Sequence, residues 1–147
     1  MGTLRVEIVT PEAALWAGEA KALFARSSEG EFAVLAEMTA TVGDLVPGVV
    51  RVDTDSGELA FTVHGGYFQV GPGDDPNDTR ATVLAGVAER TSDIDVARAQ
   101  TAKERAELAL AAEAGGDAHE PDALAVARAD LARAELRLSS AGRPSAS

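Results

Sequence analysis

The first 89 residues carry the alternating apolar and polar pattern of short strands. Leu4, Val6 and Ile8 alternate with Arg5 and Glu7, the period of a strand that buries one face. Turn signals rich in Gly, Pro, Asp and Ser separate the strand candidates that follow. These candidates cover residues 15–19, 20–26, 31–35, 49–53, 58–64, 67–70 and 79–85. Many short strands at this spacing predict a β-sandwich or flattened barrel over residues 1–89.

Two glycine-containing pairs are expected to be turns within this β-region. Pro47-Gly48 precedes one strand candidate, and Gly65-Gly66 separates two others. Gly65-Gly66 is expected to form a tight turn with positive φ. No helix is expected directly after it, which argues against a phosphate-binding loop.

A helical pattern replaces the strand pattern after Glu89. Ser92-Asp93 is a candidate N-cap, with Asp95 in the first turn, for a helix over residues 93–114 that is rich in strong helix formers. Its small-residue face is expected to carry Ala99, Ala102, Ala106 and Ala109.

A second helix is expected to begin at Pro121, after Gly115-Gly116 and a short polar segment. Because the connection is short, the two helices should form an antiparallel hairpin over residues 90–141. The tail 142–147 is expected to be disordered. In the second helix, the side expected to face the first helix follows a heptad spacing, with Leu124, Ala127, Leu131, Ala134 and Leu138.

Charge and composition narrow the range of partners. The net charge is −11, and residues 1–89 hold 5 Lys/Arg against 14 Asp/Glu. An acidic surface repels nucleic acid and anionic lipid, so neither is expected as a main partner. The chain has no cysteine and no apolar run of about 20 residues, so we expect a cytoplasmic protein that does not span a membrane.

The sequence gives no indication of catalysis or of metal binding. His64 and His119 are the only histidines, and no spacing of ligand residues forms a metal cluster. The acidic stretch 74–78 lacks the spacing of a calcium loop and is interpreted as a surface loop. Trp16 is interpreted either as a core residue of the sandwich or as an anchor that faces a partner.

Four arginines of the hairpin leave two interpretations open. Arg98 and Arg105 share one face of the first helix, and Arg133 and Arg137 share one face of the second. They could be surface residues, with Arg98 paired to Asp95 and Arg133 to Asp130. They could also surround a polyphosphate, since guanidinium groups bind phosphate oxygens in pairs.

Six strings occur in the order typical of the epsilon subunits of bacterial F-type ATP synthases, and over residues 4–141 the chain resembles that family. Ile94-Asp95-Val96-Ala97-Arg98-Ala99 matches its (I/L)DxxRA helix start, and Glu29–Leu35 is similar to its GEhGhL segment, where h is apolar. The other strings are Val6–Glu12, Leu15–Gly18, Pro47–Val52 and Val63–Val70.

The resemblance implies a non-catalytic subunit of the central stalk that couples rotation to ATP synthesis in a proton-translocating synthase. The implied partners are the gamma subunit, the membrane c-ring and, through an inhibitory hairpin, the catalytic alpha and beta subunits. Membrane association at the cytoplasmic face would be through the complex only. No cofactor is required, but a regulatory ATP is implied at Glu89, Asp95, Arg98, Arg105, Arg133 and Arg137.

One segment departs from the family pattern. The family reads LPGHAPL after its GEhGhL stretch, whereas Leu35 is followed here by 36–41, AEMTAT. In the family this loop lies near the ring of membrane subunits. A different class of function, a stand-alone nucleotide-binding sensor, remains the alternative, and co-purification with a shaft subunit distinguishes the two.

Overall fold

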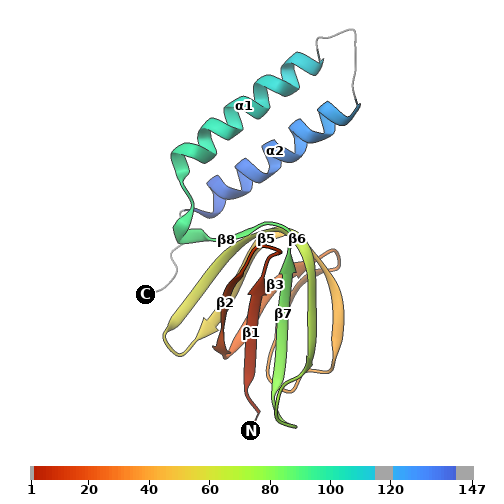
Figure 1. The fold of residues 1–147 in the computed structure, drawn as a ribbon, viewed down its shortest axis with the longest axis vertical. Coiled ribbons are helices and arrows are strands. Elements are labelled where there is room, and N and C mark those ends of the chain that lie inside the picture. Colours follow the sequence, from red (N-terminus) through yellow and green to blue (C-terminus); the bar gives the residue numbers. More distant parts are fainter. Residues whose placement is uncertain (1, 115–120, 142–147) are drawn as a thin grey trace. The chain divides into compact units, whose positions relative to one another are not determined.

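The computed structural model describes residues 2–114 and 121–141, which divide into two compact units between Ser92 and Asp93. The first unit is a β-domain and the second a helical hairpin (Figure 1). The boundary placed at Glu89 from the sequence lies inside the last strand. The tail 142–147 and the inter-helix residues 115–120, including His119, lie outside the described residues.

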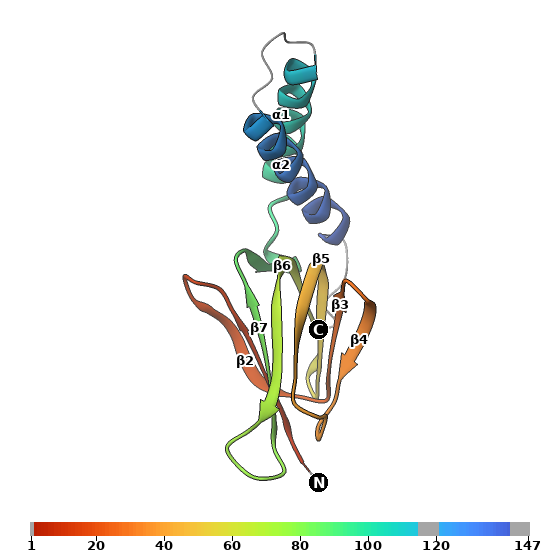
Figure 2. The same cartoon turned by 90° about the vertical axis from the view of Figure 1, so that its right-hand side faces the viewer.

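One folded sheet forms the β-domain, as Figures 1 and 2 show. Its strand order is β2-β1-β7-β6-β5-β3-β4, and β8 pairs separately with β6. β1 and β7 run parallel, and the other neighbours are antiparallel. The strands are β1 (Leu4–Val9), β2 (Ala14–Ala20), β3 (Ala22–Ser27), β4 (Gly30–Val34), β5 (Thr41–Thr54), β6 (Gly57–Pro72), β7 (Thr79–Ala85) and β8 (Ala88–Arg90).

A single apolar core lies between the two halves of this sheet. Alternate residues of β1 and β7 point inward, so that Leu4, Val6 and Ile8 are buried as their spacing predicts. Phe61 of β6 and Val52 of β5 are fully enclosed with them. The β-sandwich predicted from the alternation is therefore confirmed.

Both predicted glycine turns are wrong, because the strands run through them. Pro47-Gly48 lies inside β5, and Gly65-Gly66 lies inside β6, which joins two strands predicted as separate. The expected positive φ is present, at 93° for Gly65 and 149° for Gly66. The pair lies where β6 changes its neighbour from β8 to β7, and a Cβ on Gly66 would be 2.1 Å from the Leu84 carbonyl oxygen. The glycines therefore allow the backbone of β6 to pass close to the backbone of β7 at this point.

The second unit is an antiparallel pair of helices, α1 (Val96–Ala114) and α2 (Pro121–Ser140). Ser92-Asp93 is not the N-cap, because Thr91–Asp93 forms a short 3-10 turn. Asp95 caps α1 instead, since its Oδ1 accepts the Arg98 backbone N–H at 3.0 Å. Neither described helix is long and apolar enough to cross a membrane.

The seam between the helices is lined by small residues, as predicted for α2 but not completely for α1. Ala99 and Ala106 of α1 are buried, but Ala109 is exposed and the half-buried Leu110 follows it. Ala102 is half-buried, so Ala109 is the one predicted position of α1 that is exposed. On α2 every predicted position is buried or half-buried, namely Leu124, Ala127, Leu131, Ala134 and Leu138.

Candidate interaction and nucleotide-binding surfaces

The predicted nucleotide residues divide between the two units. Glu89 lies in β8, opposite Thr62 of β6, and belongs to the β-domain. Asp95, Arg98, Arg105, Arg133 and Arg137 all belong to the hairpin. Because α1 and α2 are antiparallel, Arg98 near the start of α1 and Arg137 near the end of α2 lie at the same end of the hairpin.

All four hairpin arginines lie on one side of the helix pair. Each comes directly before a seam residue, namely Ala99, Ala106, Ala134 and Leu138. One step back along an α-helix is a rotation of about 100°, always in the same sense. In an antiparallel pair, residues with the same offset from the seam project on the same side. The arrangement therefore gives a row of guanidinium groups along one side of the hairpin.

The two arginines of α2, Arg133 and Arg137, have interaction partners of their own. Arg133 forms an ion pair with Asp130, one turn before it, as predicted. The predicted ion pair between Arg98 and Asp95 is absent from the salt bridges of the described residues, where the Asp95 carboxylate accepts the backbone N–H of Arg98 instead. Arg98 and Arg105 are exposed, and Arg133 and Arg137 are half-exposed. The row can thus present positive charge to an anion.

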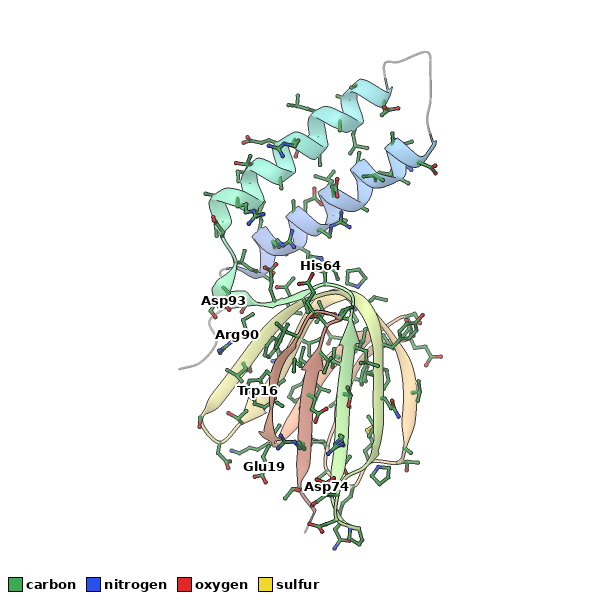
Figure 3. All side chains as sticks on the ribbon, in the orientation of Figure 1. Trp16, Glu19, His64, Asp74, Arg90 and Asp93 are labelled. Atoms are coloured by element: carbon green, nitrogen blue, oxygen red, sulfur yellow. The ribbon has the colours of Figure 1, made fainter. Side chains whose placement is uncertain are left out.

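The structure favours the core interpretation of Trp16. Its side chain is half-buried, packs against the core and lies over Gly18 of the same strand. His64 lies at one end of the β-domain, and Asp74, in the acidic 74–78 loop, lies at the other (Figure 3). Among residues 2–114 and 121–141, no group of three or more His, Asp or Glu side chains is placed to hold a metal ion.

An apolar row on the outer face of the sheet was not predicted from the sequence. Val9 of β1 lies opposite Leu84 of β7, which lies opposite Tyr67 of β6. Leu84 is 43% exposed and Tyr67 63% exposed. A hollow of about 330 Å³, lined by Val9, Thr10, Pro11 and residues 84–86, adjoins the row. The available signal was the apolar residue at an outward position of each strand, where alternation normally places a polar one.

A second hollow lies at the end of the β-domain where β1 begins. It has a volume of about 370 Å³, between the 36–41 segment and the loop from β6 to β7. Asp78 in this loop accepts hydrogen bonds from the Thr3 hydroxyl at 2.6 Å and from the Thr3 backbone N–H at 3.3 Å. These bonds hold the pKa of Asp78 below its usual value.

Comparisons with known proteins agree with the two-unit architecture. The ATP synthase delta/epsilon chain β-sandwich domain matches residues 3–91, and the delta/epsilon chain long α-helix domain matches residues 92–142. Two relatives are each described as an "ATP synthase epsilon chain". The protein from Alkalilimnicola ehrlichii is 42% identical, covering 89% of this chain and 91% of its own. The protein from Thermobifida fusca is 41% identical, covering 94% and 91%.

Solved structures share the fold at lower identity. A chain in the cryo-EM structure of the Euglena gracilis mitochondrial ATP synthase, OSCP/F1/c-ring, matches with a TM-score of 0.70 and 20% identity, covering 92% of this chain and 79% of that one. A chain in the Tetrahymena thermophila mitochondrial ATP synthase, central stalk and c-ring, matches with a TM-score of 0.58 and 14% identity, covering 94% and 96%.

The two matched domains together cover almost the whole sequence, in the order of the two structural units. The chain belongs to the delta/epsilon chain family of ATP synthases. Within that family its curated relatives are epsilon chains, so the resemblance drawn from the six sequence strings is confirmed. Epsilon chains are non-catalytic subunits, and this membership supports the assignment of the chain as a non-enzyme.

Proposed function

We propose that the chain is the rotor subunit of a bacterial F-type ATP synthase that joins the gamma shaft to the c-ring through its β-domain. The observation that carries the proposal is the apolar row of Val9, Leu84 and Tyr67 on the outer sheet face. Large side chains that are exposed in the isolated chain and adjoin a hollow are typical of a permanent interface. The shaft subunit would cover this row, and the complex would bring the chain to the cytoplasmic face of the membrane.

Co-expression with the gamma subunit of the same synthase tests this proposal. Leu84→Glu places a charge in the middle of the row and should abolish co-purification, because that charge would be buried without a partner. Ala33→Glu, at an exposed position of β4 at the far end of the sheet order, should leave co-purification intact. Unchanged co-purification of a folded Leu84→Glu chain would exclude this face as the shaft interface.

The hairpin is proposed to regulate ATP hydrolysis. The fully buried apolar residues of its seam are all alanines and its leucines are only half-buried, so the pair buries little apolar area and would change position at small cost. Extended toward the alpha and beta subunits, its arginines would meet acidic surface and block the catalytic cycle. The hairpin would thus act as a brake that does not take part in catalysis.

ATP is proposed as the ligand that keeps the hairpin compact. Arg98, Arg105, Arg133 and Arg137 project on one side, where their guanidinium groups would bind the phosphate oxygens of a tetra-anionic nucleotide. ATP can shift the equilibrium between the compact and the extended hairpin by no more than the difference in its binding free energy to these two states. The same row also favours the alternative of a stand-alone nucleotide sensor, which would bind ATP tightly and would not co-purify with a shaft subunit.

A further inference from the structure

Two arginines lie directly opposite each other on the outer face of the sheet. Arg5 of β1 is the register partner of Arg80 of β7, and each alternates with buried residues, so both side chains project on the outer side. Neighbouring strands are only about 4.8 Å apart. Residues 1–89 hold 5 Lys/Arg against 14 Asp/Glu, yet two of these five cations are adjacent. Like charges directly opposite each other are unfavourable in a sheet, so an anion bound to both would be stabilised.

The acidic neighbours of this pair hold it only weakly. Arg5 Nε is 3.9 Å from Glu7 Oε1, close to the outer limit of an ion pair. Arg80 Nη2 is 3.3 Å from Asp74 Oδ1, but the Asp74 side chain is 88% exposed. Exposed pairs of this kind contribute little free energy, so a competing carboxylate can replace Asp74 at small cost.

Arg80 also carries a donor that has no acceptor. Its Nε atom is buried and has no hydrogen-bond partner within the described part of the chain. Buried donors are nearly always paired, because an unpaired one carries an uncompensated loss of solvation. Asp74 accepts from Nη2 alone. A carboxylate that took its place could accept from Nε and Nη2 together, the paired geometry that guanidinium groups favour.

The arginine pair shares its sheet face with the apolar row. Arg80 and Leu84 are four residues apart on β7, and Arg5 and Val9 are four apart on β1, so all four side chains project on the same side. At about 3.3 Å per residue, the pair and the row are about 13 Å apart. A protein that covers the row therefore extends over the arginines as well.

We propose that Arg5 and Arg80 together bind the carboxylate of an aspartate or glutamate on the protein that covers the apolar row. The inference rests on the proposed function and adds to that interface a contact of defined charge. A protein carboxylate fits better than a polyphosphate or an anionic lipid surface, because the acidic β-domain repels highly charged anions. An arginine contact beside exposed apolar side chains is also typical of protein interfaces.

The affinity of the full chain for the gamma subunit of the same synthase tests this inference. Arg5→Gln and Arg80→Gln should each raise the Kd about tenfold, as expected for the loss of a charge-assisted hydrogen bond. Arg26→Gln is the matched control, because it removes one positive charge from an exposed position of β3. Biolayer interferometry measures the Kd, and circular dichroism establishes that each variant is folded. Arginine variants that bind as tightly as Arg26→Gln would overturn the proposal.

Leu84→Glu separates this inference from the proposed function. Loss of binding by Leu84→Glu, with wild-type binding by both arginine variants, would refute the carboxylate contact and leave the interface intact. Normal binding by Leu84→Glu would refute both. Vesicles that contain anionic phospholipid test the other source of an oxyanion. Retention on these vesicles that Arg5→Gln abolishes, with an unchanged Kd for gamma, would assign the pair to a lipid headgroup and overturn the proposal.

Nuclear magnetic resonance of arginine Nε–H groups reports the contact at the atom concerned. When the full chain binds gamma, the Arg80 Nε–H signal should move to higher proton frequency and exchange more slowly with water, because this donor gains an acceptor. The Arg26 Nε–H signal should not move. An Arg80 signal that is the same in the free and the bound chain would contradict the proposal.

Discussion

The hydroxyl of Thr3 donates a hydrogen bond to Asp78 Oδ1 over 2.6 Å and joins the chain's first residues to the loop before β7. This bond is the largest cause of the lowered pKa of Asp78, followed by the bond from the Thr3 backbone N–H. A carboxyl group with a lowered pKa in the folded state stabilises the fold above its unfolded pKa. That contribution is lost as the pH falls through the folded pKa.

Thr3→Val should therefore raise the pKa of Asp78 toward its ordinary value. Carbon-13 titration of the Asp78 carboxyl group measures this directly, and Thr3→Ser, which keeps the hydroxyl, is the matched control. Thr3→Val should lower the free energy of unfolding at about pH 6, and the difference should shrink as the pH falls through the lowered folded pKa of Asp78, because below it the carboxyl is protonated in both proteins. The same pKa in wild type and Thr3→Val would contradict the assigned cause.

Glu37→Gly should stabilise the chain by about 1 kcal/mol, because glycine adopts a φ of 67° without the steric cost of a Cβ. Urea unfolding measures the change. Glu37→Ala removes the carboxylate but keeps the Cβ, so its stability should stay close to that of the wild type. A Glu37→Gly chain no more stable than Glu37→Ala would show that the turn is not strained.

Gly66→Ala should destabilise the β-domain by more than about 2 kcal/mol, because the new Cβ would meet the Leu84 carbonyl oxygen and φ is positive. Gly71 lies in the same strand, β6, but a Cβ there meets nothing within 4 Å. Gly71→Ala is therefore the control and should change the free energy of unfolding by less than about 1 kcal/mol. Similar melting temperatures for the two variants would contradict the close approach of Gly66 in β6 to Leu84 in β7.

The sequence was sufficient to predict the order of the two units, because the spacing of apolar residues follows which side chains are buried. Leu4, Val6 and Ile8 alternate as in a strand, and the apolar residues of α2 follow a heptad spacing. It failed at Gly65-Gly66, since the need for positive φ came from a neighbouring strand and not from a turn. The α1 cap was also misplaced, because Ser92, Asp93 and Asp95 are all good capping residues and only the 3-10 turn selects Asp95.

The candidate site was predictable only in part. Spacing along each helix placed the arginines on one face per helix, and the antiparallel pairing then brings both faces to the same side. The outer row of Val9, Leu84 and Tyr67 depends on strand register, which connects residues far apart in the chain. The hollow beside Glu37 depends on loop contacts with Thr3 and Thr79 that no local pattern reports.

ATP should bind the isolated full chain, and Arg98→Ala and Arg133→Ala should each weaken binding by about 1.5–3 kcal/mol, or about ten- to a hundredfold. Arg128→Ala is the matched control, because Arg128 is exposed on α2 but follows the seam residue Ala127 and projects on the other side. Isothermal titration calorimetry measures the affinities. No heat at millimolar ATP, or equal loss with Arg128→Ala, would show that the arginine row is not a nucleotide site.

The most direct test of the central claim is ATP hydrolysis by the assembled synthase with the chain truncated after Ser92. Circular dichroism would first establish that the fragment folds cooperatively. We predict that the fragment still co-purifies with gamma and that hydrolysis rises, because the β-domain assembles and the hairpin is the brake. A folded fragment that no longer assembles, or an assembled complex whose hydrolysis is unchanged, would contradict the account.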